Sequence, residues 1–328
     1  MSHNIYNQKF ISLRQPAWHN LGLVIEDEIN AVQAGQKLGL PIITTRPIRT
    51  DDGIEIPGWK CILGKEGENA PVPFSVVSND YHEITHGEFL EAWDRATTKA
   101  PIETIGLLGK GENLFVTTKL QPFDVKGDEC DSYLLAANIL TGKEADFARV
   151  TPVRVVCQNT LNLSASRCGD EFRVVHTGES IKQIETWLTR IWRSASEKQA
   201  ALKEAYTVLA NYTPSVDSVI DVLESTYPLA LKPNADERTN DGLDLLAAWQ
   251  RGNARQIEHQ QSVNHLFEGT AVGSDLAAAR GTAWGLWNAV VEYEDYSKPR
   301  RQATSSLFGA GADRKQAAFD SLIKLAVA

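Results

Sequence analysis

The hydrophobic pattern of the chain changes at about residue 178, and this change constrains the fold more than any other feature. Before it, short β-branched or alternating apolar runs are separated by turn signals, with two short helical patterns among them. After it, the pattern is helical almost throughout, beginning with apolar residues that recur at helical spacing from Ile181 to Trp192. The sequence therefore predicts an α+β protein, in which a mixed or antiparallel sheet with packed helices (1–178) is followed by a mainly α-helical domain (179–328).

The individual elements follow from the same periodicities. In the first half we expect strands at 42–49, 59–63, 74–77, 102–108, 114–120 and 133–140, and helices at 32–38 and 89–96. The Gly-Lys-Gly sequence at 109–111 predicts a hairpin turn between two of the strands. In the second half we expect helices at 181–192, after Pro214, at 243–249, at 277–296 and at 314–325.

Composition limits the class of protein more than its activity. The chain has no apolar run of about 18 residues and no basic, apolar leader, so we expect a cytoplasmic protein without a membrane partner. Its four cysteines (Cys61, Cys130, Cys157 and Cys168) form no C-x-x-C pair and predict reduced thiols. The net charge of −9 disfavours binding of nucleic acid through a global positive field, but it leaves room for a local basic patch.

One motif matches a catalytic pattern. His82, Glu83 and His86 satisfy H-E-x-x-H, in which two histidines one helical turn apart bind zinc and the glutamate activates water. That chemistry requires the whole motif on one helix. Thr85 and Glu88, however, have the spacing of a capping box, which predicts that the helix begins inside the motif and separates the two imidazoles. A chance match is the favoured interpretation.

Other enzymatic signals are weaker. Cys157 follows an apolar run, with Arg154 or His176 as the nearest candidates to activate it, but a packed structural thiol is the favoured interpretation. No P-loop sequence is present, and the glycines at 309–311 are interpreted as a connector in preference to a phosphate cradle. The sequence therefore predicts no catalytic residues, no metal site and no cofactor.

The only dense basic run lies near the C-terminus. Lys298, Arg300 and Arg301 are followed across a Gly-rich stretch by Arg314 and Lys315. Aromatic residues precede the run, and cations beside aromatic rings are the combination that grips single-stranded nucleic acid. The helical spacing of Trp284 and Trp287 predicts that these two rings are packed inside the protein, which leaves Tyr293 and Tyr296 as the available rings.

Several stretches resemble a known family. They are Pro16 to Gly22, Thr151 to Leu161, Thr282 to Val290 followed by Asp295 and Tyr296, and Ser306 to Gly311. In their order and spacing the chain resembles the domain-of-unknown-function 932 family of phage- and plasmid-like proteins. The resemblance implies a mobile-element origin in a bacterial host and no established activity, and the H-E-x-x-H pattern is not a hallmark of that family. Tyr296 departs from it, because the resemblance leads us to expect histidine there.

Two functions from different classes remain open. The first is a non-enzymatic DNA-metabolism protein of a phage or plasmid that binds single-stranded DNA as an annealing or recombination protein, in a homo-oligomer. The second is a regulatory protein that binds a host or phage protein; a zinc hydrolase built on His82, Glu83 and His86 ranks third. Arg149, just before the central family-like stretch, and Arg154, within it, complete the first hypothesis. Its predicted nucleic-acid-binding residues are Arg149, Arg154, Tyr293, Tyr296, Lys298, Arg300, Arg301, Arg314 and Lys315.

Overall fold

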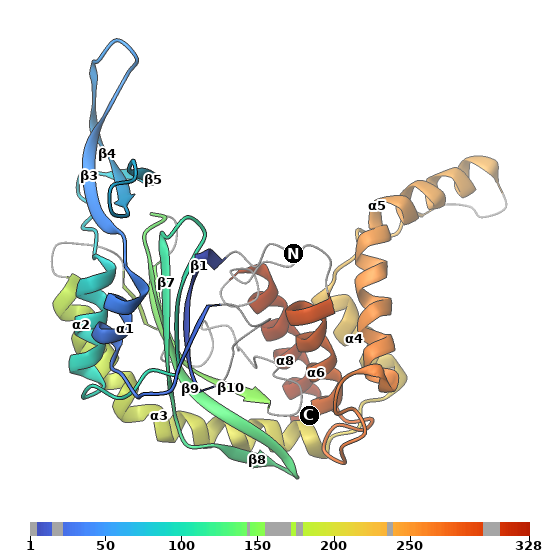
Figure 1. Ribbon diagram of the computed structural model, residues 1–328. Helices are drawn as coiled ribbons and strands as arrows, with labels where there is room; N and C mark the ends of the chain where they lie inside the picture. The colour runs from blue at the N-terminus through green and yellow to red at the C-terminus, as the bar shows by residue number, and fades with distance from the viewer. Residues whose placement is uncertain are drawn as a thin grey trace. The chain divides into compact units, whose positions relative to one another are not determined.

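The computed structural model describes residues 5–14, 22–142, 145–154, 172–174, 180–234, 239–297 and 309–328 (Figure 1). The chain divides into two compact units. Unit 1 comprises 1–121, 132–151 and 165–199, and unit 2 comprises 122–131, 152–164 and 200–328. Helix α3 (Ser180–Asn211) begins just after the predicted boundary at residue 178 and contributes residues to both units.

Most strands belong to one mixed sheet. They are β1 (Ile5–Leu13), β2 (Leu23–Ile25), β6 (Thr104–Leu108), β7 (Asn113–Lys119), β9 (Asp128–Ile139), β10 (Asp146–Arg154) and β11 (Phe172–Val174), in the order β11-β10-β9-β7-β6-β1-β2. Strand β8 (Phe123–Val125) pairs with the first residues of β9. The pair β1–β2 is parallel, whereas β1–β6, β6–β7, β7–β9 and β10–β11 are antiparallel. The mixed sheet and the α+β class predicted from the sequence are confirmed.

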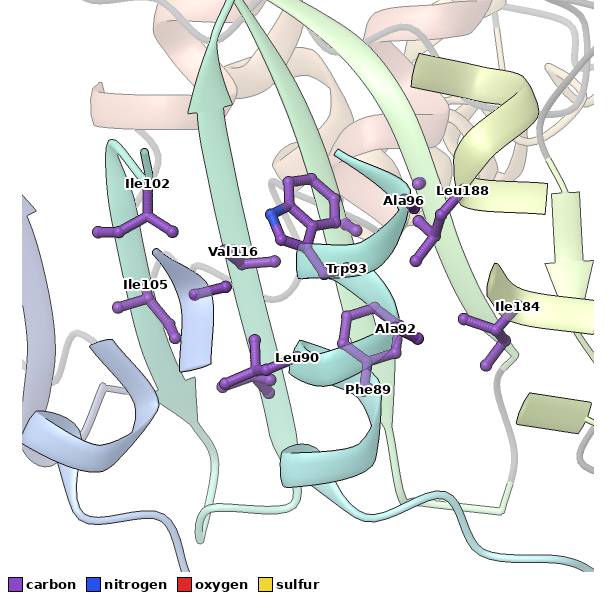
Figure 2. Close-up of a cluster of buried hydrophobic side chains, with 14 of the residues drawn as sticks. Phe89, Leu90, Ala92, Trp93, Ala96, Ile102, Ile105, Val116, Ile184 and Leu188 are labelled. Carbon is purple, nitrogen blue, oxygen red and sulfur yellow. The ribbon is translucent and has the colours of Figure 1, made fainter. Parts of the chain in front are cut away.

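Helices α1 (Ala31–Leu38), α2 (His86–Ala96) and the beginning of α3 supply the apolar core of unit 1 (Figure 2). Phe89 and Trp93 of α2 are fully buried, together with Ile105 of β6 and Val116 of β7. Each such large side chain contributes roughly 1.5–3 kcal/mol by leaving water. The core therefore fixes α2 on the sheet, and with it the residues at the start of that helix.

A second, three-stranded antiparallel sheet belongs to unit 1. Its order is β3 (Ile42–Arg49), β4 (Glu55–Lys65) and β5 (Val72–Ser78). Figure 1 shows that β3 and β4 form a long hairpin that extends beyond the main sheet of this unit. In the described part of the chain no layer packs over the far half of the hairpin, and its side chains from Arg49 to Trp59 are exposed.

Unit 2 is mainly helical. It contains the end of α3, α4 (Val216–Thr226), α5 (Asn240–His265), η2 (Leu266–Thr270), α6 (Ala283–Glu292), η3 (Tyr293–Ser297) and α8 (Ala310–Val327), of which η2 and η3 are π-helical. Its centre is aromatic: the ring of Tyr206 lies 4.9 Å from that of Trp284 and 5.1 Å from that of Trp287. The predicted packing of both tryptophans is confirmed, since neither is exposed. In the described part of the chain, no helix has the length and apolar character needed to span a bilayer.

The element boundaries show where local signals fail. Strand β3 and helix α1 agree with the predicted 42–49 and 32–38 to within one residue. The prediction of a helix from 277 is wrong, because α6 begins at Ala283, where the Thr282 side chain accepts a hydrogen bond from the Gly285 backbone. The strands β1, β2, β8, β10 and β11 were not predicted. Of these, β2, β8 and β11 have only three residues each, too few for a periodic signal.

Candidate functional site

The H-E-x-x-H sequence lies across the start of α2. The helix begins at His86, and Thr85 is its N-cap. The Thr85 hydroxyl accepts a hydrogen bond from the backbone N–H of Glu88, while the Glu88 carboxylate accepts one from the backbone N–H of Thr85. The predicted capping box is confirmed, and His82 lies before the helix, outside any helix or strand. The two histidines therefore do not stand one helical turn apart.

His86 is engaged inside the protein. Its Nδ1 lies 2.6 Å from Oδ1 of Asn138, and its Nε2 lies 2.8 Å from the carbonyl oxygen of Gly111. Asn138 in turn donates a hydrogen bond to the buried carboxylate of Asp146. Glu83 forms an ion pair with Lys60 at 2.9 Å. Because His86 and Glu83 are bound to other residues, the motif does not assemble the zinc geometry.

Tyr293 was expected on the surface, and this expectation is corrected by the structure. Its side chain is 2% exposed. Its hydroxyl forms a 2.5 Å hydrogen bond with Nδ1 of His259, which is also buried. The cause is that every residue from Leu286 to Asp295 is buried, so the helix has no exposed side at Tyr293. This ring is therefore not available for stacking on a base.

Arg314 and Lys315 are likewise bound within unit 2. Arg314 donates two hydrogen bonds to the Glu294 carboxylate, at 2.8 and 3.0 Å. Lys315 pairs with Asp295 at 2.9 Å, and neither of these two side chains is exposed to solvent. Their positive charges are neutralised by adjacent acidic residues of η3. Lys315 therefore presents no surface to a phosphate, and the partly exposed Arg314 is already bound to a carboxylate.

The other predicted residues are distributed differently. Arg149 is nearly buried, and its guanidinium carbon lies 5.0 Å from the ring centroid of Phe147. Tyr296 is half-buried near the end of η3. Arg154 is the last residue of β10, and its side chain is not among those that the structure describes. Lys298, Arg300, Arg301 and Cys157 lie outside the described residues. Of the predicted residues, the structure thus brings Arg314 and Lys315 together in unit 2. They do not form the exposed surface of cations and aromatic rings that was expected.

A different basic site lies on α3, within unit 1. An open hollow of about 850 Å³ runs along the helix face opposite the apolar stripe. The described residues that line it are Lys182, Glu185, Thr186, Thr189, Arg190, Arg193, Ser194 and Glu197. We call it the α3 hollow. The stripe of Ile184, Trp187, Leu188 and Ile191 is buried, so it holds the helix with the hollow facing outward.

The charge of the α3 hollow is locally positive although the chain carries −9. Lys182, Arg190 and Arg193 are exposed along one face. Glu185 is already paired with Arg95 at 2.8 Å, which removes part of the negative charge. In the described part of the structure, neither Lys182 nor Arg193 forms an ion pair. Cations gathered on one face are suited to phosphate oxygens.

Sequence reasoning missed this site, although a signal for it was present. The residues of the hollow recur at three- and four-residue intervals from Lys182 to Glu197, which is the spacing of one helix face. A search for dense basic runs does not detect cations spaced by a helical turn. The apolar stripe identified the helix, and its opposite face held the basic residues.

The fold and the hollow define an α+β protein with a cationic, hydroxyl-lined helix face, and its described residues contain no cluster of three or more His, Cys, Asp or Glu that could hold a metal ion. The profile of the family described as "Domain of unknown function (DUF932)" matches residues 73–319, a range that includes parts of both units. The chain belongs to this family. No curated protein and no solved structure matches it significantly.

Proposed function

We propose that this protein binds single-stranded DNA, as a non-enzymatic DNA-metabolism protein of a phage or plasmid that acts in annealing or recombination in the bacterial cytoplasm. The observation that carries the proposal is the α3 hollow, where Lys182, Arg190 and Arg193 lie on one face with Thr186 and Ser194. Its cations bind the phosphates, while the hydroxyl groups of Thr186, Thr189 and Ser194 donate hydrogen bonds to backbone carbonyls of the same helix. Sequence-independent binding of this kind suits a protein that acts on any single strand.

The length of the α3 hollow and the number of its cations set the salt dependence of DNA binding. From Lys182 to Arg193 the helix rises about 16 Å, at roughly 1.5 Å per residue. Two phosphates neutralised by Lys182 and Arg193 give a slope of log K against log salt of about −1.4, at about −0.7 per phosphate of a single strand. The affinity therefore falls about 7-fold between roughly 50 and 200 mM salt.

Fluorescence polarisation with a labelled oligo-dT tests the proposal. We expect binding at low salt with a slope near the value above, and a slope smaller by about 0.7 in the variant Arg193→Ala. Lys203→Ala is the matched control, because Lys203 is exposed on the same helix but does not line the hollow. An absence of binding at the lowest salt, or equal losses in the two variants, contradicts the proposal.

A regulatory protein that binds a host or phage protein is the second candidate. It is favoured by Leu243 and Leu245 near the start of α5, which are 51% and 54% exposed. Residues two positions apart lie on different faces of a helix, so each of these leucines by itself is suited to an apolar groove of a partner. Affinity purification from expressing cells, with and without nuclease, separates the two functions. A partner that survives nuclease and is lost in the variant Leu243→Asp supports this candidate.

A further inference from the structure

Among the described residues, no layer packs against one face of the sheet β3-β4-β5. The register pairs Arg46 with Cys61 and Cys61 with Val76, so these three side chains lie in one row on the same face. The alternation of strands adds Ile42 and Trp59 to this face. We call it the hairpin face; it comprises Ile42, Thr44, Arg46, Trp59, Cys61, Leu63, Lys65 and Val76.

The opposite face of the sheet is covered, which shows that the exposure is one-sided. Ile62 is fully buried and Val77 is 4% exposed. On the hairpin face, by contrast, Ile42 is 63%, Trp59 50% and Val76 56% exposed. Large apolar side chains gathered on one surface indicate a binding surface, whereas scattered ones do not. The hairpin face therefore has the composition of an interface.

The charge on the hairpin face is positive. Arg46 and Lys65 belong to it, and in the described residues neither forms an ion pair with a carboxylate. Pro47 lies in the edge strand β3 and has no backbone N–H to offer a further strand. The surface is thus suited to contact through its side chains, and less to extension of the sheet at this edge.

Helix α4 in unit 2 has the complementary character. Its buried side consists of Val219, Val222, Leu223 and Thr226. Its outer side exposes Val216 and Ile220, at 77% and 47%. Asp217, Asp221 and Glu224 surround them, and none of the three has a cationic partner among the described residues. This outer side is therefore apolar and acidic, where the hairpin face is apolar and basic.

We propose that the hairpin face of one copy binds the outer side of α4 of a second copy. The two surfaces match in length, since Val216 to Glu224 spans about 12 Å of helix and Ile42 to Arg46 about 13 Å of strand. They match in charge, with Arg46 and Lys65 facing the carboxylates. They also match in apolar content, since each surface has apolar side chains beside its charges. The partner is a second copy because the complement is present on the same polypeptide.

This contact joins two different surfaces, so it is heterologous. In a pair of copies, one copy keeps its hairpin face free and the other keeps its α4 face free. Further copies bind to these free faces until a ring closes or a filament grows. The inference is independent of the proposed DNA binding, because the α3 hollow shares no residue with either surface. An assembly without DNA is therefore expected.

Light scattering across a range of concentrations tests the assembly, in the absence of DNA. We expect the wild-type mass to exceed that of one chain and to rise with concentration. Arg46→Glu places like charges in contact and raises the dissociation constant about tenfold or more. Combining Arg46→Glu with Asp217→Arg and Asp221→Arg restores opposite charges and recovers the assembly. The exposed control Lys203→Glu leaves the mass unchanged.

A wild-type protein that stays monomeric at all concentrations overturns the proposal, as does an Arg46→Glu variant that assembles normally. Carbodiimide coupling of a 1:1 mixture of ¹⁴N and ¹⁵N protein gives a second readout. The reagent joins the Lys65 amine to carboxylates it touches, and we expect coupled peptides from α4 that combine one light and one heavy partner. If every coupled pair of peptides carries a single isotope, the contact lies within one chain, and the proposal is overturned.

Discussion

The ion pair between Lys315 and Asp295 allows a quantitative prediction. The two charged groups lie 2.9 Å apart, and neither side chain is exposed to solvent. Lys315→Met removes the ammonium group while keeping most of the side-chain volume. It leaves the Asp295 carboxylate in a buried place without its counter-charge, and removal of one partner from such a pair costs about 3–5 kcal/mol of unfolding free energy. We therefore expect Lys315→Met to lower the unfolding free energy of unit 2 by that amount.

The double variant tests the reason for the loss. Lys315→Met with Asp295→Leu removes both charges, and replacement of a buried pair by apolar residues is close to neutral in unfolding free energy. We therefore expect the double variant to be more stable than Lys315→Met alone. If the single variant were destabilised merely by altered packing, the second substitution would add to the loss.

Urea denaturation and hydrogen exchange of the α6 and α8 amides provide the measurements, because exchange reports on unit 2 itself. The matched control is Arg14→Met, which breaks the pair of Arg14 and Glu28. Both of those side chains are more than half exposed, so we expect a change below about 1 kcal/mol. The reasoning is refuted if Lys315→Met costs no more than this control.

Two further predictions concern unit 1 and the start of α6. Burial lowers the pKa of His86, against its hydrogen bonds, so the unfolded chain takes up the proton first. The unfolding free energy is then highest above about pH 6.5 and falls as the pH drops below it. Urea denaturation midpoints measured at one pH above and one pH below this value should fall less in His86→Gln than in the wild type. Equal falls in the two proteins contradict the assignment. Gly285→Ala places a methyl group 1.9 Å from the backbone oxygen of Ala279, so we expect a melting temperature lowered by several degrees. Gly87→Ala is the control: Gly87 has open space around it, so the substitution leaves the melting temperature unchanged or raises it.

The sequence by itself determined the elements whose signals are local. The capping box of Thr85 and Glu88 and the alternation of β3 depend on residues only a few positions apart, so both were predicted correctly. The apolar stripe of α3 was predicted for the same reason, because helical periodicity places it on one face. These are properties of the chain before any long-range contact forms.

Only the tertiary structure decided what the charged and aromatic side chains are free to do. Tyr293 meets His259 from 34 residues away, and Arg314 meets Glu294 from 20 residues away. No local pattern encodes such pairs, because packing of separate helices brings the residues together. The same packing left Arg193 on the open side of α3 and buried Lys315. A basic residue binds an outside ligand only where the fold has not already paired it, and that condition is set in three dimensions.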